Sequence, residues 1–97
     1  MSRQFVIRKQ AERDIQSIFR WYEKQEPGLG EEFLTSLGDR LETIRDFPES
    51  FPVIYSNVRR AVVTRFPYLV FYVVRPSRVS VLAVLHQSRN PAKWPGR

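Results

Sequence analysis

Residue types that can move protons and bind phosphate are concentrated in the second half of this sequence. Histidine is a side chain that can act as a general base or a general acid near neutral pH, and the sequence holds one, His86. Arg59, Arg60, Arg65 and Arg89 carry planar guanidinium groups that bind phosphate oxygens in pairs. Metal-free RNA cleavage needs a base, an acid and cations around the pentavalent phosphate. If the protein is a metal-independent endoribonuclease, we therefore expect His86, Arg60 and Arg65 to be its catalytic residues.

Each of these residues also has a purely structural interpretation. His86 would end a strand and could cap it by bonding to a neighbouring backbone group. The arginines could be solvated groups at the edge of a sheet. Alternation along a strand places Arg59 and Arg65 on one face and Arg60 on the other, so at most two of the three can point into one site.

Motifs of other common chemistries are missing from the sequence. There is no cysteine, which excludes disulfides and thiolate nucleophiles, and one histidine alone argues against a zinc site. Gly28 and Gly30 fall in a turn between helices and form no phosphate-binding loop. A Ser–His–Asp arrangement would have to take its acid from the first half of the chain. No nucleotide, flavin or haem motif is found, so we expect no cofactor.

The charges are distributed unevenly along the chain. The net charge is +6, and all ten acidic residues lie before residue 50. Residues 53–97 hold eight Lys or Arg side chains and no acid, a pattern that attracts polyanions or an acidic protein segment. Trp94 could stack on a base or, alternatively, cover the edge of the core. We expect a target or a nucleic acid to contact these residues: Arg59, Arg60, Arg89, Lys93 and Trp94.

Hydrophobic periodicity predicts two helices after a short strand at Arg3–Arg8. Apolar residues at helical spacing predict one helix from about Gln10 to Gln25 and a second that passes through Phe33 and Ile44. Pro27–Gly30 separates the two helices, and Phe47-Pro48 ends the second. The short link predicts an antiparallel helical hairpin.

After a proline-containing connection at Glu49–Asn57, the pattern changes to the period of two that is typical of strands. Three strands are predicted, and their short links indicate an antiparallel meander: Val58–Arg65, Tyr68–Arg75 and Val79–His86. Asn90-Pro91 is typical of the start of a short helical turn that runs through Lys93-Trp94.

The sequence therefore predicts one α+β domain, residues 1–97, with the chain order β-α-α-β-β-β. We expect the hairpin to pack on the meander as an acidic helical layer on a basic sheet. Trp21 and Tyr22 are interpreted as packing residues, and these aromatic residues as core: Phe5, Phe19, Phe33, Phe47 and Phe71. No signal segment or membrane-spanning run is found, which is consistent with a cytoplasmic protein without membrane contact.

Several short segments, in this order and spacing, resemble the RelE/ParE superfamily of type II toxins, often called plasmid-stabilisation proteins. They cover nearly the whole chain: Trp21-Tyr22, Pro27-Gly28-Leu29-Gly30, Phe33-Leu34, Phe47-Pro48, Val58-Arg59-Arg60-Ala61, Arg65-Phe66-Pro67-Tyr68, Phe71-Tyr72, Val84–Pro91 and Trp94. The resemblance implies the RelE/ParE-like fold and the toxin half of a bacterial toxin–antitoxin pair.

The resemblance leaves two mechanisms open. RelE-like members cut messenger RNA on the ribosome, whereas ParE-like members poison DNA gyrase and have no known hydrolytic site. The RelE-like pattern places basic residues near Val62 and Leu69 and a C-terminal tyrosine or histidine where Trp94 stands here. Val84–Ser88 looks like the ParE ending. We therefore favour the ParE-like interpretation, in which the protein is not an enzyme.

A cognate acidic antitoxin is the partner that the resemblance implies. Its amphipathic segment would dock beside the helical hairpin, at Phe19, Tyr22, Phe33 and Leu37, and an extended part could add to a sheet edge. A third alternative is a non-toxic, nucleic-acid-binding relic of the fold.

Overall fold

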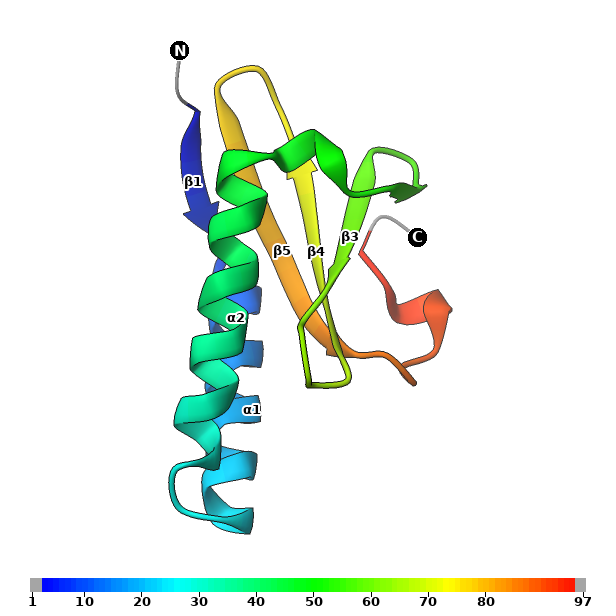
Figure 1. Cartoon of the computed structure of the whole chain (residues 1–97). Helices are drawn as coiled ribbons and strands as arrows, with labels where there is room; N and C mark the ends of the chain where they lie inside the picture. Colours follow the sequence, from blue (N-terminus) through cyan, green and yellow to red (C-terminus); the bar gives the residue numbers. More distant parts are fainter. Residues whose placement is uncertain (1–2, 96–97) are drawn as a thin grey trace.

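A five-stranded sheet, with a helical hairpin on one face, forms the body of the protein. The structure is a computed structural model that describes residues 3–95. Its elements follow in this order: β1 (Gln4–Ile7), α1 (Lys9–Gln25), α2 (Leu29–Asp46), a 3-10 turn (Pro48–Ser50), β2 (Val53–Tyr55), β3 (Val58–Val62), β4 (Tyr68–Val74), β5 (Arg78–His86) and a second 3-10 turn (Pro91–Lys93) (Figure 1). The predicted α+β class and the helical hairpin are confirmed.

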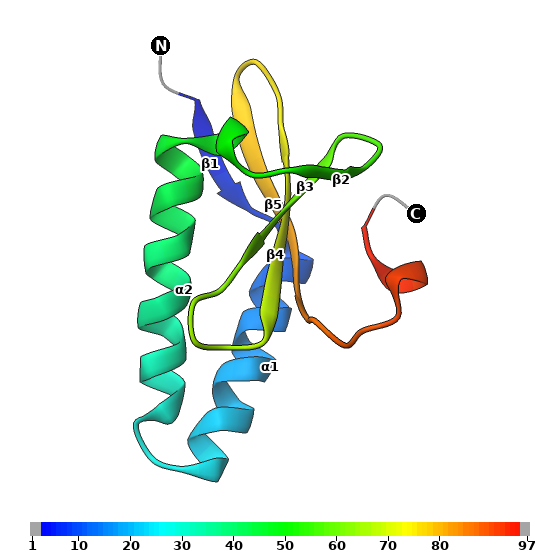
Figure 2. The ribbon, with the colours of Figure 1, turned by 45° about the vertical axis from the view of Figure 1, so that its right-hand side comes forward.

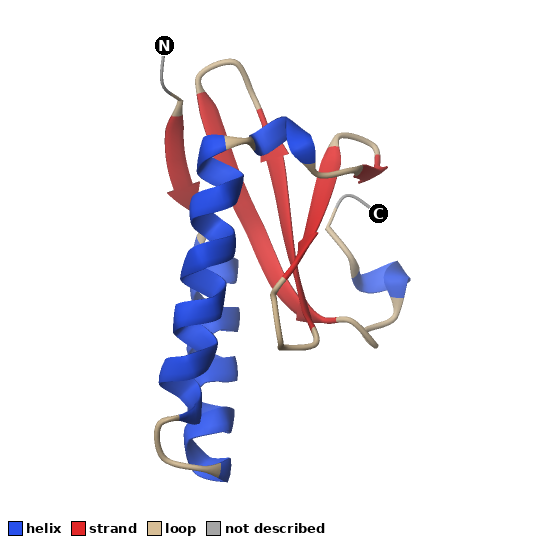
Figure 3. Ribbon diagram, viewed as in Figure 1, coloured by secondary structure: helices blue, strands red, loops and turns tan. Residues whose placement is uncertain are grey.

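The strand order is β1-β5-β4-β3-β2, so β4 lies at the centre with β5 and β3 on either side (Figure 3). β1 pairs in parallel with β5, and the other neighbours pair antiparallel. β2 was not predicted, because three residues next to Pro52 carry too little periodicity to be recognised as a strand. Pairing with the free edge of β3 satisfies its backbone groups and makes it a strand.

The turn between the helices depends on Glu23 and on two glycines. Gly28 has a φ of 93°, in the left-handed region that glycine tolerates. The Glu23 carboxylate accepts hydrogen bonds from Gly28 N at 3.0 Å and from Gly30 N at 2.8 Å. It therefore satisfies N–H groups at the start of α2 and places a negative charge at the positive end of that helix.

β3 ends three residues earlier than the sequence predicted. The Val62 carbonyl accepts a hydrogen bond from Arg40 Nε of α2 at 2.7 Å, and the chain then turns through Arg65, whose φ is 72°. The expected alternation beyond Val63 is therefore wrong. Phe66 packs on the helical side of the sheet, whereas strict alternation from Arg60 would put it on the opposite face.

The two faces of the sheet are covered by different parts of the chain (Figure 2). The helix-facing core contains Phe33, Leu37 and Ile44 of α2 packed against Val70 and Tyr72 of β4. On the opposite face lies a smaller apolar cluster that Trp94 of the C-terminal segment contacts: Val58, Leu69, Phe71, Val73 and Ala83. β4, which is apolar at nearly every position, is therefore buried on both sides, as is typical of such strands.

Two predicted packing residues lie at the surface instead. Phe47 is 64% exposed, since the buried place at the end of α2 is taken by the following Pro48. Trp21 is 55% exposed and lies edge-on to Tyr22, with ring centroids 5.1 Å apart. Of the other predicted core aromatics, Phe33 and Phe71 are fully buried, whereas Phe5 and Phe19 are half-buried.

Candidate functional site

His86 lies at the exposed end of β5, in a shallow cavity of about 280 Å³ that it shares with Asp14, Tyr68 and Arg89, among others. Its Nδ1 atom accepts hydrogen bonds from Ser88 N at 3.0 Å and from the Ser88 hydroxyl at 2.7 Å. A backbone N–H fixes Nδ1 as an acceptor, so the neutral ring carries its proton on Nε2. The ring thus makes the local backbone bond that the structural interpretation predicted.

Asp14 lies near His86 but does not orient it. One carboxylate oxygen accepts a hydrogen bond from Val84 N at 3.0 Å, and the other accepts from Gln10 at 2.8 Å. The carboxylate therefore anchors α1 to the edge of β5 where β1 has ended. No hydrogen bond joins it to His86 among the described residues, so a Ser–His–Asp relay is not formed here.

The three candidate catalytic residues lie in three different surroundings. Arg65, in the turn after β3, forms an ion pair with Glu32 of α2 at 3.4 Å. Arg60 lies on the opposite face of the sheet, where its guanidinium carbon is 5.5 Å from the centre of the Trp94 ring. The cavity that His86 lines includes neither arginine. The structure therefore does not bring these residues together around one scissile bond.

The residues predicted to bind a target are divided between the two faces. Arg59 points to the helical side and donates to the Glu49 and Phe51 carbonyls at 3.2 and 2.7 Å. Arg60 and Trp94 are on the face of the sheet opposite the helices. There the half-buried Trp94 indole packs on Phe71, with ring centroids 5.3 Å apart. Trp94 therefore covers the core edge, and its buried Nε1 atom has no hydrogen-bond partner among the described residues.

The remaining two predicted contacts, Arg89 and Lys93, are exposed. Arg89 lies beside His86 at the rim of the shallow cavity, and Lys93 is in the terminal 3-10 turn. We expected the cations to cover the sheet, but they lie around it and form a basic rim. β4 itself carries no charged residue, and the cations of residues 53–95 stand on β3, at the start of β5, in turns and in the C-terminal segment.

The four residues predicted to contact an antitoxin differ in their accessibility. Phe33 and Leu37 are 0% and 2% exposed, because they face the sheet and fill the core. Phe19 and Tyr22 are half-buried, and Tyr22 joins an aromatic cluster with Phe33, Phe66 and Tyr68. In this arrangement only Phe19 and Tyr22 keep a surface that a partner can contact.

Burial raises the pKa values of three tyrosines. For Tyr72, burial raises the pKa to about 12, against the opposing effect of the nearby Arg59 charge. Burial also raises the pKa of Tyr22 and that of Tyr68, the latter with a smaller contribution from Tyr22.

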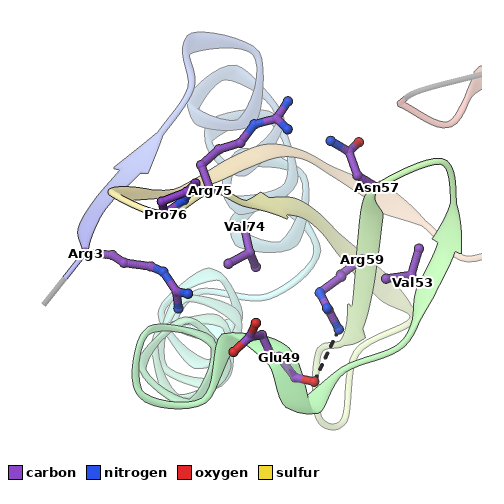
Figure 4. Close-up of a pocket in the computed structure, with 8 residues that line it drawn as sticks. All are labelled: Arg3, Glu49, Val53, Asn57, Arg59, Val74, Arg75 and Pro76. Carbon is purple, nitrogen blue, oxygen red and sulfur yellow. Dashed lines mark hydrogen bonds between the residues drawn. The ribbon is translucent and has the colours of Figure 1, made fainter. Parts of the chain in front are cut away.

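Sequence reasoning missed a cleft at the other end of the sheet. Arg3, Arg59 and Arg75 line it from three separate segments of the chain (Figure 4). The excess of cations in the second half hinted at such a site, but spacing along the sequence could not bring these three residues together.

Two further observations concern the described part of the chain. Within residues 3–95, no group of three or more His, Asp and Glu side chains is placed to hold a metal ion. The helices described here are all too short or too polar to cross a bilayer.

Comparison with known proteins identifies the family. A family model described as the ParE toxin of type II toxin-antitoxin system, parDE, matches residues 5–91. A solved structure described as the chromosomal ParDE TA system from P. aeruginosa has a TM-score of 0.79 at 13% sequence identity, over 88% of this chain and 96% of that one. At such low identity this likeness supports the fold. The comparison with curated proteins gave no match. Since the family model spans most of the chain, this protein belongs to the ParE toxin family of type II toxin–antitoxin systems.

Proposed function

We propose that this protein inhibits bacterial growth by poisoning DNA gyrase in the cytoplasm and that a cognate antitoxin neutralises it. Membership of the ParE family supports the proposal that this protein acts as a toxin. The observation that carries the choice of mechanism is the separation of His86, Arg60 and Arg65, which lie in different places on the molecule. A toxin that acts by protein–protein contact needs no assembled catalytic set, whereas a ribonuclease does.

Inducing the gene from a tight promoter would test this mechanism. We expect growth arrest with cleaved DNA and intact transcripts, and purified gyrase should accumulate cleaved plasmid in the presence of the protein. Unimpaired growth at confirmed expression of folded protein would contradict the proposal and leave the non-toxic relic as the better explanation.

The ribonuclease alternative is separated by His86 variants. His86→Asn removes the titrating ring and keeps an acceptor for Ser88 N, and His86→Ala removes both. Under our proposal both variants remain toxic as long as they fold. Cut transcripts that disappear in His86→Asn would instead identify an endoribonuclease.

Neutralisation requires a surface that an antitoxin segment can reach. Trp21, Tyr22 and Phe19 leave apolar surface exposed near the tip of the hairpin, and the acidic helices adjoin the basic rim. We expect co-expression of an acidic open reading frame adjacent to the gene to restore growth. A Trp21→Ala variant that stays toxic but escapes rescue would place the contact at this tip, and rescue of Trp21→Ala like the parent would exclude it.

A further inference from the structure

The cleft lined by Arg3, Arg59 and Arg75 has a volume of about 400 Å³, which is within the range of small-molecule sites. It opens where the start of β1 meets the β4–β5 turn, since Gln4 N donates to the Ser77 carbonyl at 2.9 Å. Its other lining residues are Glu49, Val53, Asn57, Val74 and Pro76 (Figure 4). Val74 at the base is half-buried, so the cleft combines an apolar floor with cationic walls.

Arg59 is held in a fixed orientation at this cleft. Its Nη1 atom donates to the Phe51 and Glu49 carbonyls, whereas its Nε and Nη2 atoms make no hydrogen bond within residues 3–95. These two atoms form the edge of a guanidinium that binds two oxygens of one anion in parallel. Because the protein already orders this side chain, little further conformational entropy would be lost when a ligand binds to it.

Arg3 and Arg75 add charge from the other walls. Figure 4 shows Arg3 extending into the cleft opposite Arg59, whereas Arg75 points along the rim toward Asn57. With its amide oxygen turned to Arg75, Asn57 accepts from both Nη atoms at 2.9 and 3.2 Å. Arg75 is thus fixed at the mouth of the cleft without losing its charge.

The cations in this cleft are not neutralised by ion pairs. Glu49 is the single acidic residue in the lining, against three arginines. Across the described residues one ion pair is formed, Arg65–Glu32, and it lies outside this cleft. The cleft therefore holds an excess of two positive charges that lack a counter-charge in the protein.

We propose that this cleft binds a phosphate monoester, carried either by a nucleotide or by the 5′ end of a DNA strand. A phosphate monoester carries close to two negative charges at neutral pH, which matches the excess in the cleft better than a carboxylate with one. Arg59 binds two of the phosphate oxygens, Arg3 faces the group from the other side, and Val74, Val53 and Pro76 contact the attached sugar or base. This site is independent of gyrase poisoning and can be measured on the isolated protein.

Calorimetric titration of the full-length protein tests the site with four probes: AMP, adenosine, and a short single-stranded DNA with a 5′-phosphate or with a 5′-hydroxyl. We expect each phosphorylated probe that binds to have an affinity about tenfold or more higher than that of its unphosphorylated counterpart. Binding of AMP without the DNA would identify a small-molecule site, and binding of the DNA without AMP a strand-end site. Equal affinities within both pairs, or no binding of any probe, would overturn the proposal.

Charge variants test whether the bound phosphate occupies this cleft. Arg3→Gln should weaken binding about tenfold, and Arg59→Lys should also weaken it because lysine keeps the charge but loses the fork. Arg78→Gln is the matched control, since Arg78 is exposed at the start of β5 and does not line the cleft. Equal losses in Arg3→Gln and Arg78→Gln would indicate unspecific charge attraction and refute the site.

A gain of affinity provides a test that unfolding cannot imitate. Glu49→Gln removes the one carboxylate of the lining but keeps the backbone carbonyl that orients Arg59. We expect phosphate binding to tighten about threefold. An unchanged or weaker affinity in this variant, with its circular dichroism spectrum intact, would contradict the proposed charge balance.

Discussion

Tyr72 shows how one polar atom ties two parts of the chain together. Its side chain is fully buried in β4, yet its hydroxyl donates a hydrogen bond of 2.6 Å to the Pro48 carbonyl in the 3-10 turn after α2. A buried hydroxyl without a partner is costly, so this bond links the end of the hairpin to the centre of the sheet. The apolar pattern of residues 68–74 is typical of a buried strand, but only the structure reveals the partner of the Tyr72 hydroxyl.

We expect Tyr72→Phe to lower the free energy of unfolding by about 1–2 kcal/mol, because the Pro48 carbonyl loses its donor while the packing is kept. Urea denaturation followed by circular dichroism would measure the change. Tyr68→Phe is the control, since the Tyr68 hydroxyl makes no hydrogen bond within the described residues. A loss of the same size in both variants would show that the Pro48 bond is not responsible.

Alkaline pH should destabilise the protein through the same residue. The pKa of Tyr72 is raised to about 12 in the folded state, from 10.0 when exposed. The folded state therefore keeps a proton that the unfolded state loses, and this contribution to stability is present below pH 10 and is lost as the pH rises toward about 12. Denaturation midpoints across this range should fall less steeply in Tyr72→Phe than in the parent. Identical slopes would contradict the assignment, and a residual slope is expected from Tyr22 and Tyr68.

At the scale of elements, the approach of the two helices is set by Gly30. A Cβ atom at this position would lie 2.8 Å from the Phe19 carbonyl oxygen and 2.7 Å from Glu23 Cγ. Backbone atoms of α1 cannot move aside without separating the helices. The sequence placed Gly30 in a turn, whereas the structure shows it in the first turn of α2 at the contact with α1.

Gly30→Ala should therefore destabilise the protein by about 1–3 kcal/mol through overpacking. Gly38→Ala is the matched control in the same helix, because a Cβ at Gly38 meets no atom within 4 Å. We expect it to stabilise the protein by about 0.5–1 kcal/mol through the higher helix propensity of alanine. Thermal unfolding of both variants measures the difference, and equal destabilisation would refute the close-contact explanation.

At the scale of the whole molecule, the charge asymmetry of the sequence becomes a separation between layers. The described acidic residues lie on the helical hairpin, in its turn or in the 3-10 turn that follows, and the cations of the second half lie around the sheet. These basic groups lie on β3, at the start of β5, in turns and in the C-terminal segment, and they do not form the continuous basic surface that we expected. Their field nevertheless extends over the Debye length, about 8 Å at physiological ionic strength.

An acidic antitoxin should therefore associate faster at low salt than at high salt. Stopped-flow measurements with the cognate antitoxin should show an association rate that falls as the salt concentration rises from about 0.05 to 0.15 M, with a smaller change in the dissociation rate. Association rates that do not depend on salt would exclude electrostatic steering. Lys24→Gln, on α1 and away from the sheet, should affect this dependence less than Arg78→Gln.

The sequence alone determined the two helices, the three long strands and the segregation of charge. Periods of 3.6 and 2 in Ala11–Tyr22 and Tyr68–Val74 report which side chains share a face, and this information is local. The same local pattern wrongly predicted that Phe47 and Trp21 are buried. Apolar residues at helical spacing show which face of a helix is buried, but they do not show where along the helix the sheet ends.

Tertiary structure decided which distant residues meet. The bond from Val84 N to Asp14 spans 70 positions, β2 exists because β3 offers it an edge, and the phosphate cleft takes one arginine from each of three segments. The candidate catalytic residues have separate surroundings for the same reason: Arg65 pairs with Glu32 of α2, Arg60 lies over Trp94, and neither arginine lines the cavity of His86. Packing of helices on a sheet sets these distances, and no spacing within a single element encodes them.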